Sequence, residues 1–199
     1  MKNSIFYLIA AVFGLFSCSA THEISFNKDW SGSISTVVDY TQMTAMMGEN
    51  STSMSEDSSN VAKMEKLSKL KGLSNFKTDK TDNNFVKVSY DFKDIESLNL
   101  SSNIMFNDVE FIKDEYFKLK SPKELEIIFP NQSMEEAGDD MSMFEQFGLT
   151  LIINMKRKIK NVTSNCNSAK TEGNKVTITT SLMELMDANK CHSTIIKVK

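Results

Sequence analysis

The chain has 199 residues, of which 40% are hydrophobic and 25% are charged, and its formal net charge is −3. This length suits one ordinary domain, and seven glycines with two prolines argue against a low-complexity chain. The mildly acidic balance gives no electrostatic basis for nucleic acid as the main partner. We therefore expect a folded domain and exclude a nucleic-acid-binding or largely disordered protein.

The first seventeen residues have the layout of a secretory signal. Lys2 gives a charged start, an apolar run extends from Ile5 to Phe16, and small residues follow it. The run of about twelve residues is shorter than the roughly 20 that a membrane-spanning helix needs. We therefore expect residues 1–17 to form a signal helix that is cleaved from the mature protein.

The sequence Leu15-Phe16-Ser17-Cys18 resembles the lipobox of bacterial lipoproteins. In that family the cysteine is acylated and becomes the first residue of the mature chain. The resemblance implies that Cys18 carries palmitate-type acyl chains that anchor the protein in a membrane, and that residues 18–22 form a lipidated tether. Ser19 after the cysteine resembles an outer-membrane address under the sorting rule of Gram-negative lipoproteins, so we expect an outer-membrane protein of the cell envelope.

Short strands and short helices are predicted along the first half of the mature chain. Alternating residues predict a β-hairpin from His22 to Tyr40, with its turn at 29–32. A helix is predicted over 41–48, a polar mobile loop over 49–60, and an amphipathic helix over 61–72. Residues 78–84 read as a polar link, 85–92 as a strand, and Asp94 as the cap of a short helix.

The second half continues this pattern. Residues 103–120 suggest two short strands around 113–114, and further strands are predicted at 125–129, 149–158, 175–180 and 193–198. Capping-box patterns at 133–136 and 181–184 predict two more helices. The predicted fold class is α+β, a single domain over 23–199 with a mainly antiparallel sheet and short helices packed on one face.

Two cysteines remain if Cys18 takes the lipid. An even pair in an exported protein predicts a disulfide between Cys166 and Cys191, and two buried free thiols are the alternative. In the chain-entropy model a bridge at this separation is worth about 3–4 kcal/mol.

Residue types suited to catalysis are scarce. The two histidines are His22 and His192, and the sequence has no Gly-rich phosphate loop, zinc motif or nucleophile elbow. Cys191 and His192 are neighbours, and adjacent residues on a strand point to opposite faces, so they do not form a catalytic dyad. We therefore expect a protein that is not an enzyme and that has no cofactor and no metal.

Two further features could contribute to binding. Met43, Met46 and Met47 have a spacing used for copper(I), and core packing or an adaptable binding surface are the alternatives. The basic run at 156–160 follows a predicted strand. It either contacts lipid phosphates and acidic glycans or protects an edge strand from pairing.

The mature part resembles a loose set of uncharacterised lipoproteins from Bacteroidota-type envelopes. The residues that carry the likeness are 26–29 leading to Gly32, 91–94, and 158–162. The chain is also similar to LppM-like domains, which implies an α+β fold and a role with envelope lipids.

We therefore predict a lipid-anchored, non-enzymatic envelope protein that binds an envelope lipid, a glycan or another protein. A structural or assembly accessory of an envelope complex is the alternative, and an enzyme or a copper binder is a more remote one. Binding of a lipid or glycan predicts a concave apolar pocket. An assembly role predicts a flat exposed apolar patch.

Overall fold

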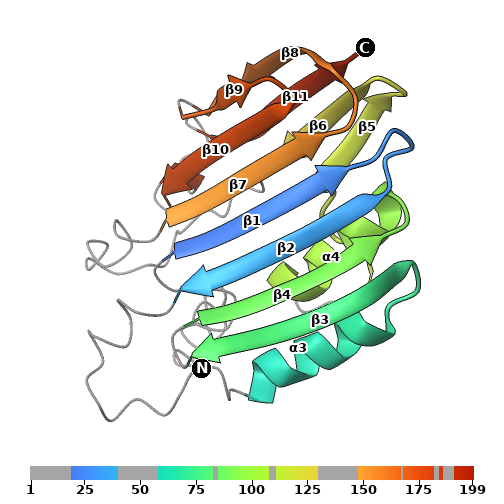
Figure 1. Ribbon diagram of the computed structural model, residues 1–199, viewed down its shortest axis with the longest axis vertical. Helices are drawn as coiled ribbons and strands as arrows, with labels where there is room; N and C mark the ends of the chain where they lie inside the picture. The colour runs from blue at the N-terminus through green and yellow to red at the C-terminus, as the bar shows by residue number, and fades with distance from the viewer. Residues whose placement is uncertain are drawn as a thin grey trace.

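The computed structural model describes residues 19–39, 58–82, 85–107, 111–129, 148–166, 168–181, 184–185 and 191–199. Its strands form two sheets (Figure 1), one of seven strands in the order β3-β4-β2-β1-β7-β10-β9 and one of four in the order β5-β6-β11-β8. The predicted α+β class with mainly antiparallel pairing is confirmed. The strands form two sheets rather than one, however, and β1 and β7 pair in parallel.

Residues that alternate between core and solvent build the larger sheet. Its strands are β1 (Ser19–Phe26), β2 (Gly32–Asp39), β3 (Leu73–Asp82), β4 (Phe85–Phe92), β7 (Gly148–Met155), β9 (Lys170–Glu172) and β10 (Lys175–Ser181). Buried side chains such as Ile24, Ile153 and Ile178 occupy every second position. The positions between them lie on the opposite face of the sheet, which is open to solvent.

A second layer covers the buried face. It contains the smaller sheet, made of β5 (Phe117–Ser121), β6 (Glu124–Ile128), β8 (Ile159–Ser164) and β11 (Ser193–Val198), and the helices α3 (Ser58–Lys69) and α4 (Ile95–Asn107). The helices contact β3 and β4, and the smaller sheet lies behind the rest (Figure 1). The ring of Phe26 meets that of Phe117 edge-on across the layers, with centroids 6.4 Å apart. The layers therefore share the main core, and a smaller buried cluster of Leu67, Ile104 and Met105 belongs to the two helices.

The predicted cap of α4 is confirmed. The Asp94 carboxylate accepts hydrogen bonds from the backbone N–H and the hydroxyl of Ser97, at 2.8 and 2.7 Å. These bonds lower the pKa of Asp94, because they stabilise its charged form. Helix α4 is longer than predicted and includes residues that were expected to form a strand.

Two asparagines explain why α4 extends into residues that were predicted to form a strand. Asn99 and Asn103 are buried on α4. Asn99 exchanges two hydrogen bonds with the backbone of Phe117, and Asn103 Oδ1 accepts bonds from the N–H groups of Lys113 and Asp114, both at 3.0 Å. Helix α4 thus pairs with backbone groups of residues 113–117 that a neighbouring strand would otherwise pair with. Of the two strands predicted over 103–120, only the second is present, as β5.

The structure corrects the predicted tether. Residues 19–22 form the first half of β1, which pairs with both β2 and β7, and Ala20 is only 1% exposed. The polar link predicted at 78–84 is also wrong, because Lys77, Thr78 and Asp79 pair with β4 as part of β3. Strands β8 and β9 were not predicted.

Several predictions fall on residues outside the described ranges. These are the signal helix over 1–17, the lipidated Cys18, the helices over 41–48 and 134–147, and most of the loop over 49–60. The last three residues of that loop begin α3. No described helix has the length and apolar character needed to cross a membrane.

Candidate functional site

The open face of the larger sheet is hollowed across four neighbouring strands. The hollow has a volume of about 430 Å³, within the range of roughly 300–1,000 Å³ that ligand pockets have. We call it the serine trough. Its polar lining is Glu23, Ser25, Ser33, Ser35, Asn75, Lys77, Ser89 and Asp91.

Strand register explains why this part of the face is hollow. The lining residues are cross-strand neighbours in two adjacent rows, and directly opposite residues have Cβ atoms about 4.5–5.5 Å apart. The first row contains Ser25, Ser33 and Asp91, and the second contains Glu23, Ser35, Ser89 and Lys77. The four serines therefore lie together, with longer side chains on either side. The trough is a consequence of the small size of serine.

Asparagine side chains orient the carboxylates of Glu23 and Asp91 at the edges of the serine trough. Asn154 Nδ2 donates a 2.8 Å hydrogen bond to Glu23 Oε1, and Asn75 Nδ2 donates a 2.6 Å bond to Asp91 Oδ2. Asn75 has a φ of 52° and lies where the register of β3 shifts. Asparagine adopts this left-handed conformation more readily than most residues. The irregularity in β3 thus brings an amide to the rim of the trough.

Polar side chains make up most of the trough lining. Ile34 and Tyr90 also border it, but both are buried, and the Tyr90 hydroxyl donates to Ser101 of α4 at 3.0 Å. Burial raises the pKa of Tyr90 to about 12. Lys77 forms no ion pair with any residue in the described ranges. The trough therefore offers hydroxyl, carboxylate and ammonium groups, whereas the sequence predicted a concave apolar pocket.

His22 was placed in the tether by the sequence, but it lies in the core. It is 8% exposed, and its Nδ1 lies 2.8 Å from the hydroxyl oxygen of Thr36 on β2. Burial lowers the pKa of His22 to about 4, because the charged form loses its hydration. His22 is thus a neutral core residue, on the side of β1 away from the trough.

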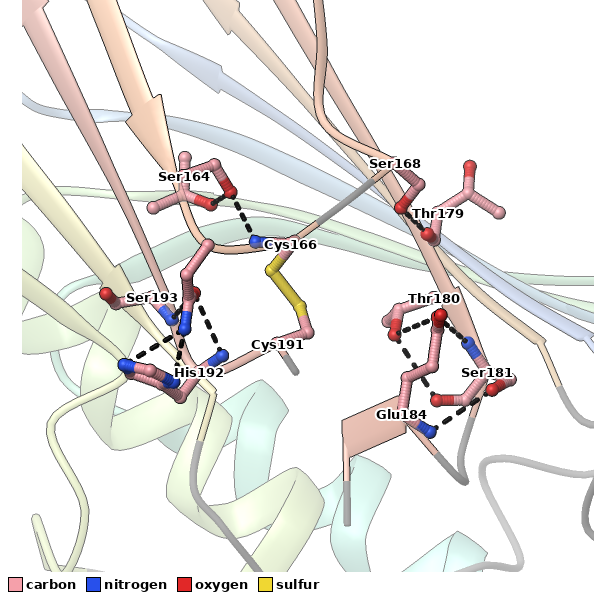
Figure 2. The surroundings of a disulfide bond; sticks show 12 residues. Ser164, Cys166, Ser168, Thr179, Thr180, Ser181, Glu184, Cys191, His192 and Ser193 are labelled. Atoms are coloured by element: carbon pink, nitrogen blue, oxygen red, sulfur yellow. Dashed lines mark hydrogen bonds between the residues drawn. A yellow bond between two sulfur atoms is a disulfide. The ribbon is translucent and has the colours of Figure 1, made fainter. Parts of the chain in front are cut away.

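The predicted disulfide is confirmed. Cys166 and Cys191 are bonded, with Cα atoms 4.2 Å apart, and they join the end of β8 to the start of β11 (Figure 2). Asn165 Oδ1 accepts hydrogen bonds from the backbone N–H groups of His192 and Ser193, at 3.1 and 2.8 Å. Because the bond consumes its thiol, Cys191 is not a nucleophile in this state.

The predicted capping box at Ser181 is also present. The backbone N–H of Glu184 donates to Ser181 Oγ, and the carboxylate of Glu184 accepts from the backbone N–H of Ser181, both at 3.2 Å (Figure 2). This corner follows β10 and lies near the disulfide in Figure 2. Both features are structural and belong to the loops that connect the two sheets.

The structure does not test the remaining predicted site residues. Cys18 and the three methionines Met43, Met46 and Met47 lie outside the described residues. Among the residues that are described, no group of three or more His, Cys, Asp or Glu side chains could hold a metal ion. Phe111 is 61% exposed and Ile112 is 37% exposed, so these neighbours form an exposed apolar spot.

No protein-family model and no curated protein matches the chain. Among solved structures, it is similar to the NMR structure of the folded domain of LppM from Mycobacterium tuberculosis. The sequence identity is 11%, the TM-score is 0.44, and the alignment covers 91% of this chain and 90% of that chain. A likeness at this level assigns neither a family nor a function.

Sequence reasoning missed the trough, although one signal was present. Ser33 and Ser35 alternate with buried residues on β2, and Ser25 and Ser89 do the same on their strands. This alternation identifies outward-facing positions. That the four serines lie side by side depends on the strand order, which the sequence did not supply.

Proposed function

We propose that this protein is a lipid-anchored, non-enzymatic lipoprotein of the cell envelope, at the outer membrane, that binds a hydroxyl-rich ligand in the serine trough. Of the ligand classes that the sequence left open, the trough favours a glycan. The observation that carries this proposal is the cluster of four serine hydroxyls, in two adjacent rows, between two oriented carboxylates. The proposed anchor is Cys18, directly before β1.

The chemistry of the lining supports a sugar over an acyl chain. Hydroxyls both donate and accept hydrogen bonds, and carboxylates accept them, so the trough can pair with several sugar hydroxyls at once. An acyl chain there would remove water from these groups without replacing their hydrogen bonds, which costs about 1–3 kcal/mol for each unpaired group. The lining therefore discriminates in favour of polar ligands.

Substitutions that fill the trough test this proposal. Ser35→Leu and Ser89→Leu place bulk in its centre, and Thr177→Leu on β10 is the matched control elsewhere on the same sheet face. Binding would be measured on an array of envelope oligosaccharides and then by calorimetry with the best glycan. We expect affinity to fall about tenfold or more for each trough variant, from two lost hydrogen bonds of about 1 kcal/mol each, and to be unchanged in the control.

Failure of every glycan to bind the folded protein would contradict this assignment. Equal affinities of the trough variants and the parent protein would place binding elsewhere on the molecule. Thermal unfolding of each variant shows whether the fold is retained, since all three positions lie on the open face of the sheet.

Replacement of the proposed lipid-bearing residue tests the anchor separately. Cys18→Ala removes the thiol that would be acylated, and Ser17→Ala is a neighbouring control that keeps it. We expect the first variant to appear in the soluble fraction and to lose incorporation of labelled palmitate. Retention of Cys18→Ala in the membrane would overturn the lipoprotein assignment.

A structural or assembly role is the second candidate. The exposed Phe111 and Ile112 favour it, because two adjacent apolar side chains in water are typical of a contact surface. A double Phe111→Ser, Ile112→Ser variant would disrupt an envelope complex under this hypothesis and leave glycan binding unchanged. Co-purification of crosslinked neighbours from membranes, compared between the parent protein and the double variant, distinguishes the two roles.

A further inference from the structure

Three turns and the carboxyl terminus meet at the end of the molecule where β1 finishes (Figure 1). The backbone N–H of Lys156 donates to Phe26 O at 3.0 Å, which joins the turn after β7 to the end of β1. The N–H of Val198 donates to Lys123 O, and that of Lys199 to Lys158 O, both at 2.9 Å. These bonds hold segments that are far apart in sequence at one end of the fold.

Arg157 acts as a structural residue at this end. Its guanidinium carbon lies 4.9 Å from the ring centroid of Trp30, and its N–H groups donate to the backbone carbonyls of Pro122, at 2.5 Å, and Lys28. Trp30 Nε1 also donates to Pro122 O at 3.2 Å. Arg157 therefore fastens the turns of β1–β2 and β5–β6 to its own turn, and the lysines beside it are left for other contacts.

Five lysines surround this arginine, and we call them the basic tip. They are Lys28, Lys123, Lys156, Lys158 and Lys199. All five are exposed, and none forms an ion pair with a residue in the described part of the chain. Two carboxylates lie beside these lysines in sequence, and both have partners: Asp29 accepts bonds from the hydroxyl and the N–H of Ser31, and Glu124 pairs with Lys197 at 3.1 Å. Positive charge is thus concentrated at one end of a chain whose net charge is −3.

The basic tip lies far from the proposed anchor. Strand β1 has eight residues, and at about 3.3 Å per residue it separates its two ends by roughly 25 Å. Because Ser19 directly follows Cys18 and already belongs to β1, no slack exists that would let the tip fold back to the anchoring membrane. The tip therefore faces away from the acyl chains.

We propose that the basic tip docks on the phosphate headgroups of an anionic lipid surface opposite the membrane that holds the anchor. Three observations carry this: the five exposed lysines, their fixed arrangement around Arg157, and their position at the far end of β1. Turns at the end of a molecule can approach an extended charged surface directly, and the net negative charge of the rest of the chain favours contact through this end alone. Lysine binds phosphate as a point charge, and each lysine near an anionic membrane contributes about 1 kcal/mol. The inference rests on the proposed anchor at Cys18.

Vesicle bridging tests the proposal with the full mature protein. The lipidated chain would be inserted into phosphatidylcholine vesicles, and insertion confirmed by flotation. Labelled acceptor vesicles of phosphatidylcholine, with or without phosphatidylglycerol, would then be added and captured acceptors counted. We expect capture only of the acceptors that contain phosphatidylglycerol, and a steep loss of capture as salt is raised.

Charge variants assign the effect to the tip. A triple Lys123→Gln, Lys156→Gln, Lys158→Gln variant removes three tip charges and keeps Arg157. A triple Lys69→Gln, Lys87→Gln, Lys170→Gln variant removes the same charge from α3, β4 and β9. We expect the first to weaken capture about 100-fold and the second to leave it nearly unchanged.

Three results would overturn the proposal. The first is equal capture of neutral and anionic acceptor vesicles. The second is an equal loss of vesicle capture in the two triple variants. The third is binding of soluble polyphosphate without capture of anionic vesicles, which would reassign the tip to a soluble polyanion. If flotation shows no insertion, the anchor proposal fails by itself, and co-sedimentation of the unanchored chain with anionic vesicles still decides whether the tip binds them.

Discussion

Buried His22 should make the stability of the fold depend on pH. Burial lowers the pKa of His22 to about 4 in the folded protein, whereas an unperturbed histidine has a pKa of 6.5. As the pH falls below 6.5, the unfolded chain takes up a proton that the folded protein excludes, and the equilibrium shifts toward unfolding. The stabilisation is thus complete above pH 6.5 and is lost as the pH falls toward 4.

The size of the effect follows from these two pKa values. Their difference corresponds to about 3 kcal/mol in total, and about 2 kcal/mol of this is lost between roughly pH 7.5 and pH 5. The free energy of unfolding of a domain is usually about 5–15 kcal/mol, so a loss of this size is a large part of it. His22 therefore decides a substantial share of the acid sensitivity of the protein.

Urea unfolding at a series of pH values measures this contribution. His22→Gln keeps a polar side chain near Thr36 without a titrating ring, so its stability should fall about 2 kcal/mol less than that of the parent protein between the two pH values. His192→Gln, at an exposed histidine, is the control and should follow the parent protein. If the parent and His22→Gln lose stability in parallel, the reasoning from burial is refuted.

Three substitutions test other parts of the fold by urea unfolding. Gly32→Ala should destabilise by more than about 2 kcal/mol, because the added methyl carbon would lie 2.0 Å from the backbone oxygen of Ser25; stability close to that of the parent would refute the close approach of the two strands at this hairpin. Asn103→Ala should cost about 2–4 kcal/mol, because it leaves the backbone groups of residues 113–114 without partners, and hydrogen exchange should accelerate there. Cys191→Ser in an oxidising buffer should cost about 3–4 kcal/mol, and addition of a reductant should lower the stability of the parent protein to that of the variant but leave the variant unchanged.

Local patterns in the sequence predicted many individual elements correctly. Alternation, helical spacing or capping residues predict the hairpin of β1 and β2, helix α3, the turn with Gly72 that follows it, the Asp94 cap and the strands β4, β6, β7, β10 and β11. These features depend on neighbours within a few positions of the chain, and the same neighbours are visible in the sequence.

Elements whose pairing comes from distant residues were predicted poorly. The segment over residues 78–82 is polar on its own, but pairing with β4 satisfies its backbone and makes it part of a strand. Residues 19–22 read as a tether, and parallel pairing with β7, more than a hundred positions away, draws them into the sheet. Residues 103–107 stay helical because Asn103 bonds to a later segment.

The sequence by itself determined the class of the fold, which two cysteines were available to pair once Cys18 is set aside, and the scarcity of groups for catalysis, whereas the structure decided that Cys166 and Cys191 are bonded. Tertiary structure decided where binding chemistry lies. The serine trough exists because strand order places four short side chains from three strands side by side, and the basic tip exists because Arg157 fastens separate turns together. A sequence shows which side chains a strand presents, but only the packing of strands against one another shows which of them share a surface.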